Sequence, residues 1–220
     1  MYLGEMALLM ASVLVMTGLV KGITARLGFN DFSAAFVIFL MVLLNVRGGV
    51  KLTKSFTLSL GGILSVAAST FALFKRSESG KDILLALFSL TGTIALTFAY
   101  SLHFLESIPT DPHALAPLLA IPTGLWCALS GKRTFATCLF SAVTGGFIGV
   151  GLYQIFFRKS GNIGGSYAFT VMWFSAFFGL ALQYLLTVMM RAVKSPRADS
   201  YFEAGEMKEE EEKEENKNQR

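Results

Sequence analysis

The run Phe135-Ala-Thr-Cys-Leu-Phe-Ser-Ala-Val-Thr-Gly-Gly-Phe-Ile-Gly-Val-Gly-Leu-Tyr-Gln-Ile-Phe-Phe157 decides the fold class of this chain. It holds no charged side chain, and it lies between Lys132-Arg133 and Arg158-Lys159. A helix that crosses a bilayer needs about 20 predominantly apolar residues, and positive charges gather in the loops at its ends. The run therefore predicts a membrane-spanning helix.

The composition of the whole chain agrees with this prediction. Of its 220 residues 53% are hydrophobic and 15% are charged, whereas soluble domains carry about 25% charged residues. The formal net charge of +4 comes from basic residues at the ends of apolar runs, which is typical of membrane topology and does not indicate nucleic-acid binding. Barrel strands alternate in hydrophobicity over about ten residues, so these uniformly apolar runs favour helices.

Seven apolar runs approach the length of a span: Leu3–Val20, Phe32–Val46, Phe56–Phe74, Ile83–Leu105, Ala114–Leu129, Phe135–Phe157 and Tyr167–Val193. We predict an all-α, polytopic integral membrane helix bundle of about seven transmembrane helices over residues 1–194. Six remain an alternative, because the second run is short and Pro117 and Pro122 interrupt the fifth. Residues 195–220 are a charged, low-complexity segment with no apolar face, which predicts a disordered tail.

The distribution of Lys and Arg predicts the orientation. The first, third and fifth loops and the start of the tail hold ten, whereas the N-terminus and the other loops hold five. Because the richer side faces the cytoplasm, we expect a multi-pass protein of the cell membrane with its N-terminus outside and its tail in the cytoplasm. The second loop, with Arg47, Lys51 and Lys54, is the exception on the outer side.

Two ladders of small and hydroxylated residues run along the fourth and sixth runs. Within each ladder the residues recur every four positions and so share one helical face. The first ladder contains Ser89, Thr93, Thr97 and Ser101, and the second contains Ser141, Gly145 and Gly149. In membranes such faces let helices approach closely and hydrogen-bond. Two interpretations stay open, helix packing and a narrow hydrated path for a small solute.

Both histidines of the chain lie between the fourth and fifth runs, with two acids; the four residues are His103, Glu106, Asp111 and His113. Imidazole and carboxylate are common zinc ligands, but the spacing matches no established zinc pattern. A pH-sensitive contact and an ordinary polar turn, with Asp111 as N-cap and Pro112 as the first helical residue, are the other interpretations. We expect no bound metal and no cofactor.

The remaining polar residues argue against an enzyme. Cys127 and Cys138 stand in no metal-ligand spacing and are expected to be packing residues, and no ionisable residue lies near the middle of any run. Beyond Ser and Thr, the embedded polar side chains are Asn45, Gln154 and Gln183. No pattern typical of intramembrane proteolysis or ion-coupled transport is present.

Three short segments resemble a known family: Leu44-Asn-Val-Arg-Gly-Gly-Val50, Gly146-Phe-Ile-Gly149 and Ile163-Gly-Gly165. They are similar to motifs of a family of polytopic bacterial and archaeal membrane proteins that is known only as a domain of unknown function. The resemblance implies a bacterial or archaeal membrane protein. That family has acids where this chain has Gly151 and Thr170, so an ionic role for those positions is not implied here.

These observations lead to two functional hypotheses. The first is a non-enzymatic structural or accessory protein of the bacterial cell membrane, which packs with partners through its small-residue faces and its charged tail. The second is a small permease or channel that uses the Ser/Thr-lined face of the fourth run and a similar stripe of the third run, formed by Ser55, Ser59, Gly62, Ser65 and Ser69. The lipid bilayer is the expected partner in both, and the oligomeric state is left open.

Overall fold

The computed structural model describes residues 3–18, 21–77, 79–107, 112–130, 134–158 and 161–190. Eight helices and three short strands make up these residues. In chain order they are α1 (Leu3–Met16), α2 (Lys21–Leu27), α3 (Asp31–Val46), β1 (Gly49–Lys51), β2 (Phe56–Ser59), α4 (Leu60–Arg76), α5 (Gly80–Ser107), α6 (Pro112–Ser130), α7 (Phe135–Phe157), β3 (Gly161–Ile163) and a last helix, Ser166–Met190. The tail expected at 195–220 lies outside the described residues.

Three helices are long and apolar enough to cross a membrane: Gly80–His103 within α5, the whole of α7, and the last helix. α1 and α3 are apolar but have only 14 and 16 residues, below the length of about 17–25 residues that a span needs. The structure thus supports a helical membrane protein with at least these three spanning candidates. The number of seven spans stays a prediction.

Two of the apolar runs are helical over only part of their length. The first run ends as a helix at Met16, and Gly18 then takes a φ of 76°, a left-handed conformation that favours glycine. The third run begins as strand β2, and helix α4 starts only after Ser59. Ser59 caps α4, because its hydroxyl accepts a hydrogen bond from the Gly62 backbone N–H.

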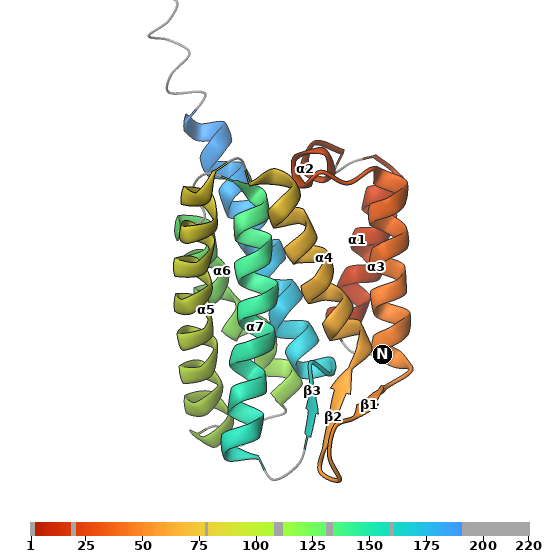
Figure 1. The fold of residues 1–220 in the computed structure, drawn as a ribbon, viewed down its shortest axis with the longest axis vertical. Helices are drawn as coiled ribbons and strands as arrows, with labels where there is room; N and C mark the ends of the chain where they lie inside the picture. Colours follow the sequence, from red (N-terminus) through yellow and green to blue (C-terminus); the bar gives the residue numbers. More distant parts are fainter. Residues whose placement is uncertain are drawn as a thin grey trace, which may run out of the picture. The chain divides into compact units, whose positions relative to one another are not determined.

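A small sheet joins two loops that are far apart in the sequence. β1 pairs antiparallel with β2, and β2 pairs parallel with β3, with Thr57 opposite Asn162. The loop before α4 and the loop after α7 therefore share one sheet at one end of the helices (Figure 1). The sequence predicts only helices and loops here, because strands this short show no clear alternation of apolar and polar residues.

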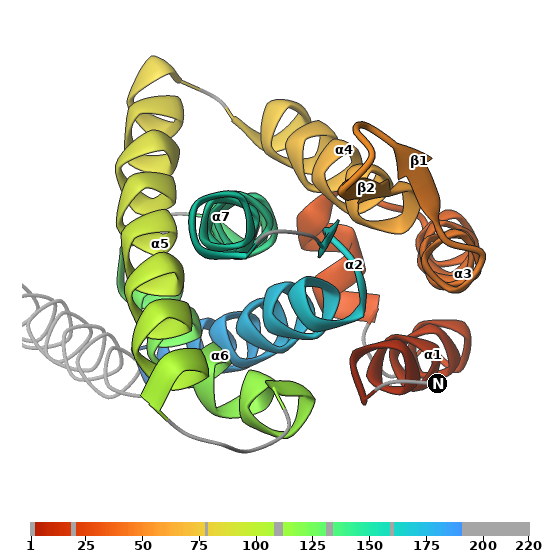
Figure 2. The same ribbon diagram turned by 90° about the horizontal axis from the view of Figure 1, so that it is seen from below.

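The chain divides into two units, residues 1–183 and 184–220, and the packing described below lies within the first. α7 is its central helix and packs against α4, α5 and α6, while α1 packs mainly against α3 (Figure 2). α6 remains helical through Pro117 and Pro122 and begins at Pro112, as predicted for the first helical residue.

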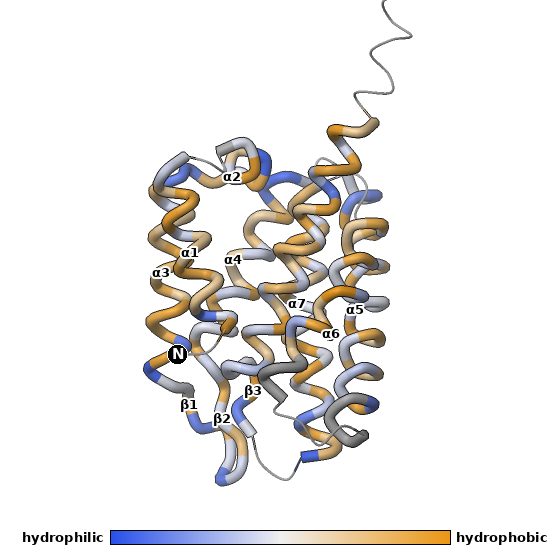
Figure 3. The backbone as a smooth tube through the Cα atoms, turned by 180° about the vertical axis from the view of Figure 1, so that it is seen from behind, coloured by the Kyte–Doolittle hydropathy of each residue, from blue (hydrophilic) through white to orange (hydrophobic). Residues whose placement is uncertain are grey.

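Most of the helices are hydrophobic along their middle parts, and hydrophilic residues lie at α2, at the end of α4 and in the sheet (Figure 3). One end holds α2, the end of α4 and the start of α5, and the other holds the sheet (Figure 1). At the α2 end the Lys75 Nζ donates to the Gly28 carbonyl oxygen at 2.6 Å, and the Arg76 guanidinium donates to the Ala25 carbonyl oxygen. These two bonds hold α2 against α4.

Candidate functional site

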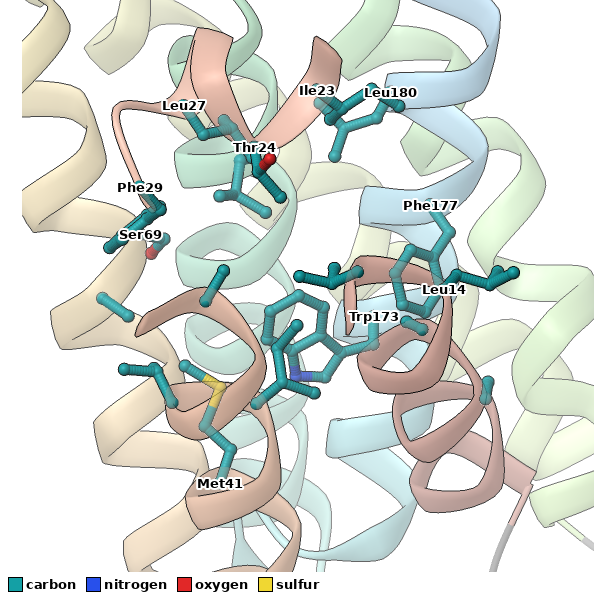
Figure 4. Close-up of a pocket in the computed structure, with 18 of the residues that line it drawn as sticks. Leu14, Ile23, Thr24, Leu27, Phe29, Met41, Ser69, Trp173, Phe177 and Leu180 are labelled. Atoms are coloured by element: carbon teal, nitrogen blue, oxygen red, sulfur yellow. The ribbon is translucent and has the colours of Figure 1, made fainter. Parts of the chain in front are cut away.

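An apolar cavity of about 410 Å³ lies among α1, α2, α3, α4, α7 and the last helix (Figure 4). Its volume falls within the range of roughly 300–1,000 Å³ that is usual for small-molecule sites. Nearly all of its wall is hydrocarbon, and the lining includes Met10 and Leu14 of α1 and Trp173 and Phe177 of the last helix. The cavity is therefore suited to an apolar occupant.

The cavity extends along the helices from α2 toward the sheet end. Ile23 and Leu27 of α2 lie at one end, and Trp173 and Met41 lie at the other (Figure 4). On the last helix the lining runs from Trp173 to Ala181, which corresponds to about 12 Å at 1.5 Å of rise per residue. The cavity is thus elongated parallel to the helices.

One side of the cavity is open between α1 and the last helix. Met10 and Leu14 of α1 line the cavity and are 69% and 42% exposed. Ala181 of the last helix also lines it and is exposed. The same side chains therefore face both the cavity and the surroundings of the helices, so a ligand can enter sideways between these two helices.

The few polar side chains of the cavity wall are already hydrogen-bonded within the protein. The Thr24 hydroxyl donates to the Asp31 carboxylate, and the Ser69 hydroxyl donates to the Val66 carbonyl oxygen at 2.9 Å. At the sheet end, the Trp173 Nε1 donates to the Ser65 Oγ at 3.3 Å. The wall consequently offers an occupant hydrocarbon contact and almost no hydrogen bond.

A buried polar network lies beyond Trp173 and Met41, at the sheet end of the same helices. The Asn45 Nδ2 donates to the Glu5 Oε1 at 2.8 Å, and the Ser166 Oγ donates to the same oxygen at 3.3 Å. The Ser59 Oγ donates to the Asn45 Oδ1 at 2.6 Å. The network joins α1, α3, the β2–α4 junction and the last helix, and Glu5 at its centre is only 2% exposed.

Close backbone contacts support this network on two sides. A Cβ added at Gly4 would lie 2.6 Å from the Thr170 Cα, and one added at Gly61 would lie 2.6 Å from the Asn45 Cβ. Only glycine allows approaches this close, so α1 meets the last helix, and α3 meets α4, at the level of the network. The polar network is thus enclosed by tight packing.

The sequence patterns point to Asn45 but not to Glu5. Glu5 is the only charged residue of the run Leu3–Val20, and an ionisable side chain within a membrane-embedded segment is a functional candidate by default. That signal was available, but Glu5 stands near the start of the run, where an acid is also expected to favour the positive end of a helix dipole. Only the structure places its carboxylate beside Asn45 and Ser166.

The two ladders found in the sequence face each other. Thr93 of α5 lies against Gly145 of α7, and Thr97 lies against Gly149; a Cβ added at either glycine would lie 2.6 or 2.8 Å from the facing threonine Cβ. The Ser141 hydroxyl donates to the Ala86 carbonyl oxygen at 3.5 Å. At Thr93 and Thr97 the two helices therefore approach too closely for a column of water between them.

The other members of the ladders are also buried. Ser89 forms a hydrogen bond of 2.6 Å with Ser130 of α6, the Thr93 hydroxyl donates to the Ser89 carbonyl oxygen at 2.8 Å, and Ser101 is fully buried. Cys127 lies 3.1 Å from the Thr93 Oγ1, and both cysteines are buried free thiols.

The four residues between the fourth and fifth runs yield no site among the described parts of the chain. His103 is exposed on α5. Asp111 lies outside the described residues, as do the side chains of Glu106 and His113. No group of three or more His, Cys, Asp or Glu side chains able to hold a metal ion occurs within the described residues.

No family model, no curated protein and no solved structure matches the chain.

Proposed function

We propose that this chain is a non-enzymatic, multi-pass protein of the bacterial cell membrane that binds an acyl chain of a membrane phospholipid in its apolar cavity. The cavity of about 410 Å³ carries this proposal, because its wall is almost entirely hydrocarbon and its open side lies between two apolar helices. The proposal refines the accessory role expected from the sequence. It makes a lipid the specific partner.

The dimensions of the cavity favour a single lipid chain. Its length of about 12 Å is close to the depth of one leaflet, which is about half of the 30 Å hydrocarbon core. A helix of a second copy is less suited, because a helix about 10 Å across needs a wider groove than one flexible hydrocarbon chain. The segment 195–220 of this chain is also unsuited, because it is rich in charged side chains.

The position of the cavity favours the cytoplasmic leaflet. The cavity begins beneath α2, and the first and third loops at this end hold Arg26, Lys75, Arg76 and Lys81. Positive residues gather on the cytoplasmic side, where they attract anionic phospholipid headgroups. In this orientation the N-terminus and the sheet face outward, and the tail at 195–220 faces the cytoplasm, where it is available to a protein partner.

The contacts of the ladders support packing rather than transport. A solute path along the Ser/Thr face of α5, the fourth run, would require space where Gly145 and Gly149 of α7 now lie against Thr93 and Thr97. Small residues at such positions are those that let membrane helices associate closely. We therefore place the permease hypothesis second.

Quenching of Trp173 fluorescence by a brominated lipid tests the proposal. The chain has two tryptophans, so Trp126→Phe leaves Trp173, which is 7% exposed, as the only emitter. The protein is reconstituted in vesicles of phosphatidylglycerol whose acyl chains carry bromine near the methyl end. We expect strong quenching of Trp173, because a chain in the cavity reaches the indole, whereas lipids around the protein do not.

A variant with a filled cavity tests whether the quenching comes from a lipid in the cavity, and a second alanine variant is its matched control. Ala11 lines the cavity on α1, and Ala95 is exposed on α5 away from it. Ala11→Phe in the Trp126→Phe background should reduce the quenching, and Ala95→Phe should leave it unchanged. Equal quenching in both variants would mean that the bromine reaches Trp173 by another route, and the proposed lipid site would be wrong.

A further inference from the structure

We propose that Trp173 and Met41 set the length of the acyl chain that the cavity accepts, with the Glu5 network behind them as the barrier to longer chains. This inference rests on the proposed function, since it concerns the chain bound in that same cavity. It assigns the two side chains a role in specificity.

Trp173 closes the sheet end of the cavity in a fixed position. Its indole reaches from the last helix to α4, where the Nε1 donates to the Ser65 Oγ at 3.3 Å. Its ring also packs between Phe169 and Phe177, with centroid separations of 6.5 and 5.8 Å. A side chain held by a hydrogen bond on one edge and by two rings forms a firm end wall.

Met41 completes the end wall from α3. Its side chain is buried, and its backbone is close to α4, because a Cβ added at Gly61 would lie 2.5 Å from the Met41 carbonyl oxygen. α3 therefore cannot move toward α4 to reshape this end. The thioether is flexible, so Met41 adapts to the end of a chain, whereas Trp173 limits its depth.

The region behind the wall cannot accept hydrocarbon without loss. Asn45 follows Met41 by one helical turn, and Glu5 precedes the cavity residue Ala7 on α1. A methylene group pushed between them would break the hydrogen bonds from Asn45 and Ser166 to the Glu5 carboxylate and leave buried polar groups unpaired. The side walls of the cavity are therefore apolar, and the buried polar groups at its sheet end limit its length.

This arrangement predicts a cutoff in chain length. Binding should strengthen with each methylene that gains packing contacts in the cavity until the chain meets the indole, and further methylenes should give no gain. The purified full-length protein is mixed in detergent with an equimolar series of saturated lysophosphatidylglycerols of increasing chain length. Native mass spectrometry then gives the bound fraction of each lipid.

Variants of the two tryptophans separate the role of the wall from a general loss of packing. Trp173→Ala and the milder Trp173→Leu should both move the cutoff to longer chains, and Met41→Ala should do so from the opposite wall. Trp126→Ala is the matched control, because this indole donates to the Ser89 carbonyl oxygen at 3.0 Å and does not line the cavity; its cutoff should equal that of the wild type.

The outcomes distinguish this inference from the function on which it rests. If the wild type binds the series and shows no cutoff, or if the cutoff stays the same in all three wall variants, Trp173 and Met41 do not set the accepted chain length. The proposed lipid site would still stand in that case. If the wild type retains none of the lipids, both proposals fail together.

Discussion

Asn45→Ala should destabilise the protein strongly, because Asn45 bonds to both Glu5 and Ser59 in the buried network. The substitution removes the hydrogen bond to the Glu5 Oε1 and the acceptor of the Ser59 hydroxyl. Loss of a hydrogen bond to a charged group costs about 1.5–3 kcal/mol, and the Ser59 hydroxyl left without its acceptor costs about 1–3 kcal/mol. The Glu5 carboxylate keeps its hydrogen bond from Ser166, so we expect a total loss of about 3–5 kcal/mol.

Thermal unfolding in detergent micelles, followed by circular dichroism, measures this loss. A change of 1 kcal/mol shifts the Tm of a domain of this size by about 2–4 °C, so we expect Asn45→Ala to lower the Tm by roughly 6–20 °C. Asn30→Ala is the matched control, because Asn30 is exposed and its side chain forms no capping hydrogen bond. Its effect should stay within about 0.5 kcal/mol.

A double substitution shows whether the hydrogen bond itself carries the effect. Replacing both partners by apolar groups of similar size can be nearly neutral, so Glu5→Leu combined with Asn45→Leu should cost less than the sum of the single variants. If the two single effects simply add, or if Asn45→Ala has the same Tm as Asn30→Ala, the network does not hold α1 and α3 to the other helices. Our reasoning about Glu5 would then be wrong.

Three further predictions follow from particular contacts. Gly145→Leu should lower the Tm, because its Cβ would lie 2.6 Å from the facing threonine, whereas Gly80→Ala, with no atom within 4 Å, should not; equal Tm values would contradict the close packing of α5 and α7. Thr134→Ala should cost about 0.5–2 kcal/mol by removing the N-cap of α7, and an unchanged denaturant midpoint would show that this cap contributes nothing. In whole cells an impermeant thiol reagent should label Ser107→Cys but not Ser195→Cys, and the reverse pattern would invert the proposed orientation.

The helical and strongly apolar character of the chain could be predicted from local sequence. The run Phe135–Phe157 was predicted as a helix with the bounds that α7 has. This succeeded because the cost of placing residues in lipid depends on the composition of one continuous segment. The prediction was wrong in detail over the third run, where β2 occupies the start of an apolar segment, because pairing with β1 and β3 satisfies its backbone groups.

The sequence predicts which helical faces carry the ladders, but it does not predict that these faces meet. The four-residue spacing of Ser89, Thr93, Thr97 and Ser101 indicated one helical face, and Ser141, Gly145 and Gly149 indicated another. Sequence spacing cannot say that these two faces meet. The packing of parallel helices α5 and α7 decides it, and so favours contact over a hydrated path.

By itself, the sequence determined that the chain forms apolar helices suited to a membrane, because that property is additive along each segment. The tertiary structure alone decided the cavity and the network behind it. Glu5, Asn45, Ser59 and Ser166 come from four distant segments, and no local pattern relates them. Their hydrogen bonds, and the space that Trp173 leaves open above them, exist only because the helices pack in this particular order.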